Sequence, residues 1–455
     1  MKRLSGTDGI RGVARQYPLD PATLEKIGAA ITYCLKKEHP NPSILIGRDT
    51  RESGPSIEES LTRGILGSQG RVALGGVLPT PAIAYLTKKR DFDAGIVISA
   101  SHNPYQDNGI KVFSSNGLKI SDEMEEEIEA LVLDRSFVPI LPQNSTPYKF
   151  VDKSLINDYK NFLLSIPEPP LSLRGMKVVL DCAQGATYCI APSVFASLGA
   201  EVHSLFVEPN GRNINQGCGS LYPQSLATEV QRLGANLGVA FDGDGDRAIF
   251  VDQEGRILDG DYILMVCACY LKSRGKLSSN AVVATVMSNL GLKKALQQEE
   301  IEVLTTKVGD KYVLSTMLRE GINLGGEQSG HLIFTDHSTT GDGILTVIKV
   351  LEITCHLRQD LSLLAEGMVK YPQVLLNVPV ATKPPWQKLP EVVAKIKEIE
   401  EELGNGGRVV VRYSGTEPLA RVMIEGEDQQ TIQLYAKEIA KAIEKSIGTS
   451  KGSQP

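Results

Sequence analysis

Short apolar stretches alternate with amphipathic stretches along most of the chain. Residues 93–100 (DAGIVISA) are mostly apolar and β-branched, which is typical of a strand buried on both faces of a mainly parallel sheet. Residues 43–50 predict another strand that runs into a polar loop, and residues 56–70 show helical apolar spacing that ends in glycine. This order recurs through the first ~360 residues and predicts an α/β fold built from βα units.

Interruptions of this periodicity predict four domains. Proline and polar residues at 137–150 follow a predicted acidic helix at 122–133, which indicates a first boundary. The last segment has an α+β pattern that ends in a periodic helix, whereas the preceding segments are similar βα units, compatible with a duplicated architecture. The predicted domains are residues 1–150, 151–254, 255–368 and 369–455.

Composition narrows the choice of partners and compartment. The 455 residues are 42% hydrophobic and 22% charged, as in globular proteins, and the net charge of −6 argues weakly against nucleic acid or an anionic membrane as the principal partner. No apolar run approaches the ~20 residues of a membrane span, and the N-terminal MKRLSGTDGIRG lacks the apolar region of a secretory signal. We therefore expect a soluble, cytoplasmic protein whose seven cysteines are reduced and mostly buried.

A polar loop follows the apolar strand predicted at 93–100. Ligands gather beyond the carboxyl ends of strands in such sheets, and the next residues are Ser101 and His102. Residues 107–109 (DNG) form a turn signal, so the serine and histidine are expected on a constrained loop. A serine can carry a transferable phosphoryl group, while His102 and Lys111 can stabilise its charge or move protons. On spacing alone, a structural turn remains the alternative to a nucleophile.

Three aspartates alternate with glycines in the stretch FDGDGDRAIFVD. Asp242, Asp244 and Asp246 would repel one another unless a cation compensates their charge, and hard oxygen ligands indicate Mg²⁺ or Ca²⁺. A calcium EF-hand loop requires Gly at its sixth and Glu at its twelfth position, where this chain has Arg247 and Gln253. Mg²⁺ is therefore favoured over calcium and over a solvated acidic turn. It would leave a place for a phosphate oxygen that Arg247 could help to hold.

Further polar stretches offer groups for hydroxyls and phosphate. In SGTDGIRG, glycine amides and Arg11 suit an anion, and in GGEQSGH, Glu327 and Ser329 can bind hydroxyls. In RYSGTEPLAR the residues that suit a phosphate, together with glycine amides, are Arg412, Ser414, Thr416 and Arg421. Each stretch alone is compatible with a simple loop. Together they provide separate groups of residues for phosphoryl transfer, metal binding, polyol recognition and phosphate binding.

The chain resembles the α-D-phosphohexomutases over almost its whole length, and bacterial phosphoglucosamine mutases most of all. The likeness rests on GTDGIRG, SASHNPYQDNGIK, DGDGDR, GEQSGH and RYSGTEPLAR, which stand in the family order. Glutamine in GEQSGH is the phosphoglucosamine mutase version, where phosphomannomutase/phosphoglucomutases more often have methionine. Two departures are Ser5, in place of a common phenylalanine, and Tyr413, in place of a common proline, which puts the stiffness of that loop in question.

The resemblance implies a fold and a set of site residues. The fold is three related mixed-sheet α/β domains plus a smaller C-terminal α+β domain around a central cleft. Ser101 is implied to be the phosphoserine and to bind Mg²⁺ with Asp242, Asp244 and Asp246. The expected catalytic residues are Ser101, His102, Lys111, Arg11 and Arg247. The expected substrate-binding residues are Glu327, Ser329, His331, Arg412, Ser414, Gly415, Thr416 and Arg421.

The resemblance also implies an activity: reversible conversion of glucosamine 6-phosphate to glucosamine 1-phosphate, through a phosphoserine and a sugar 1,6-bisphosphate intermediate, to supply UDP-N-acetylglucosamine synthesis. Lys111 is the preferred group for proton transfer, with His102, Arg11 and His331 as alternatives. The nearest alternative function is the same chemistry on glucose or mannose phosphates, as in phosphomannomutase/phosphoglucomutase.

Two other function classes fit the sequence less well. An aspartyl-phosphate phosphatase is disfavoured because DGDGDR lacks the Thr or Val expected after the paired aspartates. A sugar-phosphate-binding protein without turnover is disfavoured because the serine, the three aspartates and Lys111 are all present. The sequence does not determine the oligomeric state.

Overall fold

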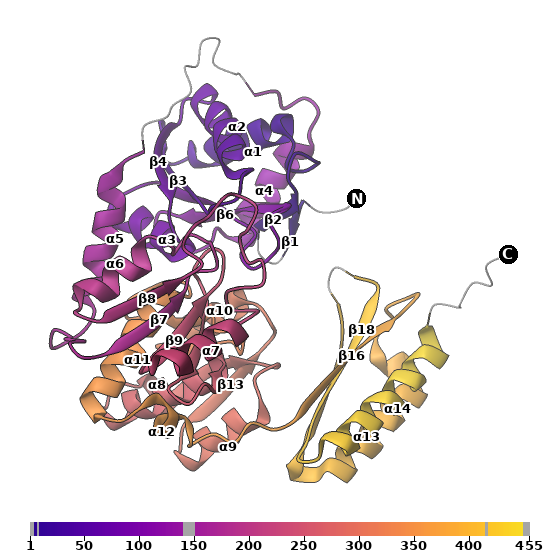
Figure 1. The fold of residues 1–455 in the computed structure, drawn as a ribbon. Coiled ribbons are helices and arrows are strands. Elements are labelled where there is room, and N and C mark those ends of the chain that lie inside the picture. The colour runs from indigo at the N-terminus through magenta and orange to yellow at the C-terminus, as the bar shows by residue number, and fades with distance from the viewer. Residues whose placement is uncertain (1–3, 7–8, 140–150, 415–416, 449–455) are drawn as a thin grey trace. The chain divides into compact units, whose positions relative to one another are not determined.

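A computed structural model describes residues 4–6, 9–139, 151–414 and 417–448 (Figure 1). Contacts divide the chain into two compact units, which are described separately. The larger unit comprises Met1–Thr285 and Glu300–Gly367, and the smaller unit comprises Val286–Glu299 and Met368–Pro455. The described residues form three sheets in the larger unit and one sheet in the smaller unit.

The first sheet of the larger unit mixes parallel and antiparallel strands. Strand β3 pairs in parallel with β4 and β5, whereas β6 pairs antiparallel with both β5 and β2. In spatial order the strands are β1 (Ser5–Gly6), β2 (Gly9–Val13), β6 (Asp107–Ser114), β5 (Ala94–Ile98), β3 (Ser43–Arg48) and β4 (Arg71–Val77).

Helices cover both faces of this sheet, which explains why its central strands are apolar at successive positions. Ile44 and Ile46 of β3 belong to the core formed with three helices on one face. On the opposite face, a Cβ at Gly47 would lie 2.4 Å from the side chain of Ile83, so glycine allows helix α3 to lie close to β3. The helices are α1 (Pro21–Leu35), α2 (Gly54–Gly67) and α4 (Asp122–Leu133) on the first face and α3 (Thr80–Lys89), followed by α5 (Lys153–Ser165), on the second.

The second and third sheets of the larger unit have the same mixed character. The second contains β11 (Ile257–Leu258), β10 (Ala248–Asp252), β9 (Leu237–Phe241), β7 (Lys177–Asp181) and β8 (Glu201–Leu205). The third contains β13 (Glu302–Thr306), β12 (Ala281–Thr285), β14 (Leu324–Gly326) and β15 (Leu332–Phe334). The helices of this part are α6 (Ile190–Ser197), α7 (Gln224–Leu233), α8 (Gly260–Ser273), α10 (Asp310–Glu320), α11 (Gly343–Leu357) and α12 (Leu361–Ala365).

One arrangement recurs in all three sheets and places the polar loops. A strand of the parallel core, β5, β9 or β14, turns directly into an antiparallel neighbour, β6, β10 or β15. The three connecting loops are residues 99–106, 242–247 and 327–331. Each loop therefore follows the carboxyl end of a parallel strand, where ligands gather in α/β sheets. This repetition agrees with the duplicated architecture that the sequence pattern suggested.

The predicted turn at residues 107–109 is wrong, because these residues begin strand β6 and pair with β2. The chain reverses earlier, where Asn103 N donates to Ala100 O and Asp107 N donates to Pro104 O. Asn108 is buried, and its amide donates to the hydroxyl of Ser53. A partner distant in sequence thus satisfies a polar residue that is otherwise typical of turns.

The smaller unit is an antiparallel sheet with helices on one face (Figure 1). Its strands are β16 (Gln373–Pro379), β18 (Leu419–Glu425) and β17 (Arg408–Tyr413), and its long helices are α13 (Pro390–Leu403) and α14 (Gln429–Ile447). The predicted α+β pattern is confirmed here. Residues 286–299 fall within the predicted range 255–368, but their helix α9 (Leu290–Gln298) groups with this unit, where Leu290 N donates to buried Glu425.

The seven cysteines are thiols, as predicted, and four of them are buried. The buried ones are Cys34, Cys182, Cys218 and Cys267. In the part of the chain that the structure describes, no helix combines the length and the apolar character needed to cross a bilayer.

Candidate active site

Ser101 lies on the loop between β5 and β6 in a conformation that few non-glycine residues adopt. Its φ of 53° is in the left-handed region, and the residue is only 1% exposed. The hydroxyl donates to Oδ2 of Asp242 at 2.6 Å and lies 3.3 Å from Nδ1 of His102. A Cβ at Gly243 would lie 2.5 Å from Ser101 O, so glycine lets the aspartate loop approach the serine backbone. The prediction of a constrained serine loop is confirmed.

The three aspartates converge on the loop between β9 and β10. Asp242, Asp244 and Asp246 are all buried, and each offers a carboxylate oxygen within 4.8 Å of the others. The Oδ1 atoms of Asp244 and Asp246 are buried without a hydrogen-bond partner among the described residues. Two unsatisfied anionic oxygens in a buried cluster are the donor set that a hard cation requires. The residues present therefore fit a divalent metal.

The charges of the cluster act on one another strongly. Burial, together with repulsion from Asp246 and Asp244, raises the pKa of Asp242 well above its ordinary value. Burial would also raise the pKa of Asp246, but attraction by Lys111, His331 and Arg247 lowers it far below the ordinary value. The aspartates are therefore not equivalent, and a cation would favour the ionised form of Asp242 most.

Basic side chains approach the aspartates from strand β6 and from the end of the aspartate loop. Lys111 of β6 is 3% exposed, and its Nζ lies 3.0 Å from Oδ2 of Asp244 and 3.6 Å from Oδ2 of Asp246. The backbone N–H of Arg247, just before β10, donates to Asp242 at 3.2 Å, and its Nε lies 3.8 Å from Asp246 Oδ1. Both cations thus stand where a phosphate oxygen beside the cluster would be stabilised.

His102 is neutral at physiological pH. Burial, with the positive charges of Arg247 and Arg11, lowers the pKa of its imidazole to about 4. Because the charge of Arg11 acts on this ring, β2 contributes its arginine to the same group of residues as the serine loop. The residues predicted for phosphoryl transfer and those predicted for metal binding are therefore brought together.

The GEQSGH stretch forms a tight turn between β14 and β15. Glu327 N donates to His331 O, and Gly330 N donates to Glu327 O, both at 3.0 Å. Gly330 has φ of 89°, and a Cβ there would lie 2.4 Å from Ala248 O. Glycine therefore allows this turn to pack closely against the start of β10. The hydroxyl of Ser329 is buried without a hydrogen-bond partner among the described residues, so it can bind a ligand hydroxyl.

His331 connects this turn to the aspartates. Its Nε2 accepts from Gly341 N at 3.0 Å, and its Nδ1 lies 3.6 Å from Oδ2 of Asp246. Glu327 Oε1 accepts from Gly309 N at 2.9 Å, and its charge acts on Arg247. The predicted sugar-binding residues therefore border the aspartate cluster.

The arginines of the RYSGTEPLAR stretch form a cluster in the smaller unit. Arg412 and Arg421 are directly opposite each other on β17 and β18. Burial and, after it, the charge of the neighbouring Arg421 lower the pKa of Arg412, while Arg421 Nη2 pairs with Glu417 Oε2 at 2.9 Å. Ser414 is buried beside them, while Gly415 and Thr416 lie outside the described residues.

Tyr413 is anchored although it stands where proline was expected. Its ring stacks on Trp386 with centroids 4.1 Å apart and planes at 8°, and its hydroxyl donates to Pro384 O at 2.8 Å. Lys383 Nζ donates to Ser414 O at 2.6 Å. Contacts with residues 383–386 therefore hold Tyr413 and Ser414, where proline would stiffen the backbone locally. Residues 383–386 were not predicted to take part in the site, although they contain the only tryptophan of the sequence.

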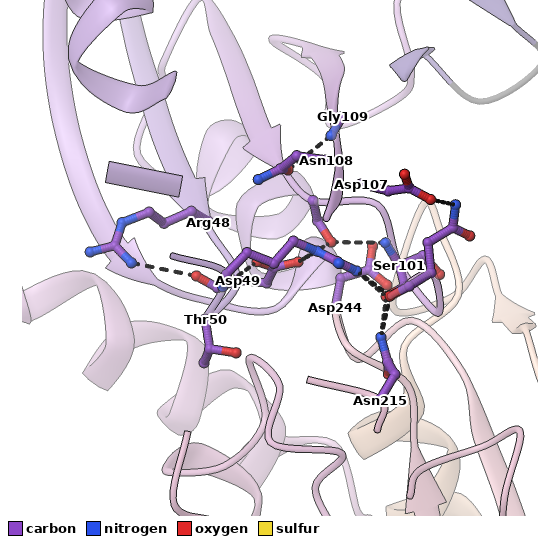
Figure 2. A network of polar contacts seen from close by, with 12 residues as sticks. Arg48, Asp49, Thr50, Ser101, Asp107, Asn108, Gly109, Asn215 and Asp244 are labelled. Atoms are coloured by element: carbon purple, nitrogen blue, oxygen red, sulfur yellow. Dashed lines mark hydrogen bonds and ion pairs between the residues drawn. The ribbon is translucent and has the colours of Figure 1, made fainter. Parts of the chain in front are cut away.

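A buried polar network behind Ser101 was not predicted from the sequence either. Figure 2 shows Asp49 and Asn215 on different sides of the serine backbone, and both belong to this network. Asp49 follows the carboxyl end of β3, as Ser101 follows that of β5, and this shared position was an available signal. Asn215 had none, because it lies in the long connection between β8 and α7.

Comparisons with known proteins agree with this geometry. Family models described as phosphoglucomutase/phosphomannomutase match four parts of the chain: alpha/beta/alpha domain I at 2–138, domain II at 156–255, domain III at 259–371 and the C-terminal domain at 375–442. The phosphoglucosamine mutase of Syntrophus aciditrophicus (strain SB) is 50% identical over 451 residues, which cover 98% of this chain and 100% of that protein.

Solved structures share the fold. A phosphoglucomutase/phosphomannomutase family protein from Burkholderia thailandensis aligns with a TM-score of 0.81 at 23% identity, over 99% of this chain and 100% of that one. The N-acetylphosphoglucosamine mutase of Aspergillus fumigatus, in complex with GlcNAc-6P and magnesium, aligns with a TM-score of 0.67 at 17% identity, over 98% and 96% of the two chains. The predicted fold class is thereby confirmed.

Proposed function

The chain belongs to the phosphoglucomutase/phosphomannomutase family, and we propose that it interconverts glucosamine 6-phosphate and glucosamine 1-phosphate. The observation that carries this activity is the buried Ser101 hydroxyl, 2.6 Å from the first of three clustered aspartates. The substrate is supported by 50% identity, over the full length, to a phosphoglucosamine mutase. The product supplies the synthesis of amino-sugar nucleotides such as UDP-N-acetylglucosamine.

In this mechanism, phosphorylated Ser101 is the donor. The bond between phosphorus and Oγ breaks while a bond forms to O1 of glucosamine 6-phosphate; the proton of that hydroxyl passes to a base, and Oγ takes up a proton as it leaves. The resulting sugar 1,6-bisphosphate then transfers its 6-phosphoryl group to Ser101 Oγ, which gives up its proton while O6 takes one up, and this step releases glucosamine 1-phosphate and the phosphorylated enzyme. A fixed serine suits this chemistry because phosphoryl transfer depends on positioning and charge stabilisation.

Basic residues around the serine stabilise the transferred group. Arg11, Arg247 and Lys111 supply positive charge, and neutral His102 supplies a ring nitrogen 3.3 Å from Oγ. We assign the proton transfer to Lys111, with His102, Arg11 and His331 as alternatives. The Nζ atom of Lys111 lies 3.0 Å from Oδ2 of Asp244 and 3.6 Å from Oδ2 of Asp246, which places it beside the proposed metal ligands.

The aspartate loop is assigned to a metal ion. Asp242, Asp244 and Asp246, with Ser101, would hold Mg²⁺, whose charge when bound would neutralise oxygens of the transferred phosphoryl group. The two buried carboxylate oxygens without hydrogen-bond partners support this assignment. The complex of the Aspergillus fumigatus relative with GlcNAc-6P and magnesium supports the choice of metal and of a sugar phosphate as ligand.

The remaining loops are assigned to the substrate. Hydroxyls of the sugar would bind Glu327, Ser329 and His331. The phosphate that is not being transferred would bind Arg412, Ser414, Gly415, Thr416 and Arg421. A reaction on phosphorylated sugars for nucleotide-sugar synthesis also supports a cytoplasmic location.

Phosphorus NMR tests the proposed activity and its substrate. The purified protein is incubated with Mg²⁺, a trace of the matching sugar 1,6-bisphosphate, and glucosamine, glucose or mannose 6-phosphate. We expect glucosamine 1-phosphate to form fastest. Faster conversion of glucose or mannose phosphate would keep the mechanism and overturn the substrate, whereas no conversion of any sugar would overturn the activity.

A further inference from the structure

Arg51 is a fully buried arginine whose guanidinium binds the backbone of the serine loop. Its exposed fraction is 0%, which is rare for arginine unless the charge is paired and hydrogen-bonded. The Nη2 group donates to Ser101 O and to Asn103 O, each at 2.9 Å, and Nη1 donates to Pro104 O. One rigid fork therefore binds three carbonyls of the loop that carries the proposed phosphoserine.

Asp49 fixes this arginine and reaches the serine by a second route. Its Oδ2 accepts from Arg51 Nε at 2.8 Å and from the hydroxyl of Ser99 at 2.6 Å. That same hydroxyl accepts from Ser101 N at 2.9 Å. The buried carboxylate of Asp49 therefore binds Arg51, which donates to the Ser101 carbonyl. It also binds Ser99, whose hydroxyl accepts from the Ser101 amide.

Asn215, in the connection between β8 and α7, also binds the carbonyls of the serine loop. Its Nδ2 donates to Ser101 O at 2.9 Å and to Asn103 O at 3.0 Å, and the bond to Ser101 can be followed in Figure 2. The carbonyls of Ser101 and Asn103 therefore each accept from both Arg51 and Asn215. We call Asp49, Arg51, Ser99 and Asn215 the serine cradle.

The cradle explains how Ser101 stays in an unfavourable backbone conformation. A non-glycine residue with φ of 53° persists when its surroundings over-determine it, and here the amide and carbonyl of Ser101 are both bound. The backbone in turn sets the direction of the Cα–Cβ bond and thus the place of Oγ, 2.6 Å from Asp242. None of the cradle side chains is needed to touch a substrate for this effect.

We propose that Arg51 and Asn215 are positioning residues for phosphoryl transfer, acting through the carbonyls of Ser101 and Asn103 to hold Oγ in line with the sugar hydroxyl. This inference rests on the proposed mutase function and deepens it. An error of about 1 Å in the position of a reacting atom can lower a rate about 100-fold, so loss of the cradle acts on kcat more than on KM.

Three variants of the full-length protein test the inference. Asn215→Asp keeps the size of the side chain and tolerates a positive φ, but a carboxylate cannot donate to the two carbonyls. Asn213→Asp is the matched control, because Asn213 lies in the same loop and donates to Glu208 O instead of the serine loop. Arg51→Lys keeps a positive charge beside Asp49 and loses the fork.

Each protein is first phosphorylated with glucosamine 1,6-bisphosphate. Intact mass spectrometry measures the fraction of protein that carries the phosphoserine, and kcat is expressed per phosphorylated site. We expect kcat to fall at least about 30-fold in Asn215→Asp and Arg51→Lys, with KM changed less than about threefold, while Asn213→Asp matches the wild type. If Arg51→Lys does not fold, the two asparagine variants decide the question.

Two other outcomes are distinguishable. A merely structural role would lower the melting temperature and the phosphorylated fraction but leave kcat per phosphorylated site equal in Asn215→Asp and Asn213→Asp, which overturns this inference alone. A folded wild-type protein that converts no hexose phosphate overturns the proposed function and this inference with it.

Discussion

The hydroxyl of Ser101 and the carboxylate of Asp242 share a 2.6 Å hydrogen bond across 141 positions of sequence. The two residues come from equivalent loops of two sheets, β5 to β6 and β9 to β10. A phosphoryl group on this oxygen would bring further negative charge to a carboxyl whose pKa burial and two neighbouring aspartates already raise. Compensation of charge is therefore a condition of the proposed chemistry.

The first prediction concerns Ser101→Ala. Removing the hydroxyl removes the proposed phosphoryl carrier, so we expect turnover to fall at least about 10³-fold without loss of the folded state. Incubation with a sugar 1,6-bisphosphate should leave the mass of the variant unchanged. Ser115→Ala, at an exposed position beyond strand β6, is the control. Turnover near the wild-type rate by purified Ser101→Ala would reject the phosphoserine role.

The second prediction concerns Asp244→Asn, which keeps the shape of the side chain but removes a charge from the aspartate cluster. We expect the Mg²⁺ concentration for half-maximal activity to rise about tenfold or more, and chelation of the metal should stop turnover reversibly in the wild type. Glu254→Gln, at an exposed carboxylate beyond β10, should behave as wild type. Identical metal titrations for all three proteins would exclude Asp244 as a ligand.

Much of the site could be predicted because its signals are local. The apolar run before Ser101 and the alternation of glycine with Asp242, Asp244 and Asp246 each lie within a few residues, and both mark loops that follow buried strands. The order of the polar stretches added the family resemblance. Local patterns therefore identified the loops that the structure brings together.

Contacts between distant residues could not be predicted in the same way. The pattern of buried strands does not distinguish a parallel neighbour from an antiparallel one, so the hairpin of β5 and β6 was not foreseen. Asn108 was taken as a turn residue because its buried partner, Ser53, lies 55 positions away. The four hydrogen bonds that Arg51 and Asn215 donate to the carbonyls of Ser101 and Asn103 likewise exist only in the folded chain.

The third prediction concerns the stack of Tyr413 on Trp386. Aromatic pairs contribute about 0.5–1.5 kcal/mol beyond burial, and this pair holds Tyr413, which precedes the residues proposed to bind the distal phosphate. We expect Trp386→Leu to raise KM for the sugar phosphate about three- to tenfold, with the phosphorylation of Ser101 unchanged. Trp386→Phe keeps a ring and should raise KM less. Equal KM values for the two variants would show that the stack does not restrain the loop.

The fourth prediction concerns pH and stability at Asp342, which caps helix α11 through Leu345 N and accepts from the hydroxyl of Tyr159. Burial raises the pKa of this carboxyl from its ordinary value to about 6, against the opposing effect of its hydrogen bonds. Between about pH 4 and pH 6 the folded state keeps a proton that the unfolded state has lost. The contribution of Asp342 to the free energy of unfolding therefore falls as pH rises through this window, by up to about 3 kcal/mol.

Asp342→Asn keeps an oxygen that can cap the helix but cannot titrate, so its melting temperature relative to the wild type should rise between pH 4 and pH 7. Tyr159→Phe is the opposing control. It removes a hydrogen bond that favours the carboxylate, so its melting temperature relative to the wild type should fall over the same range. Melting curves at several pH values measure both differences. A constant difference between Asp342→Asn and the wild type would mean that Asp342 does not change its protonation in this window, and that its hydrogen bonds offset the effect of burial in the folded state.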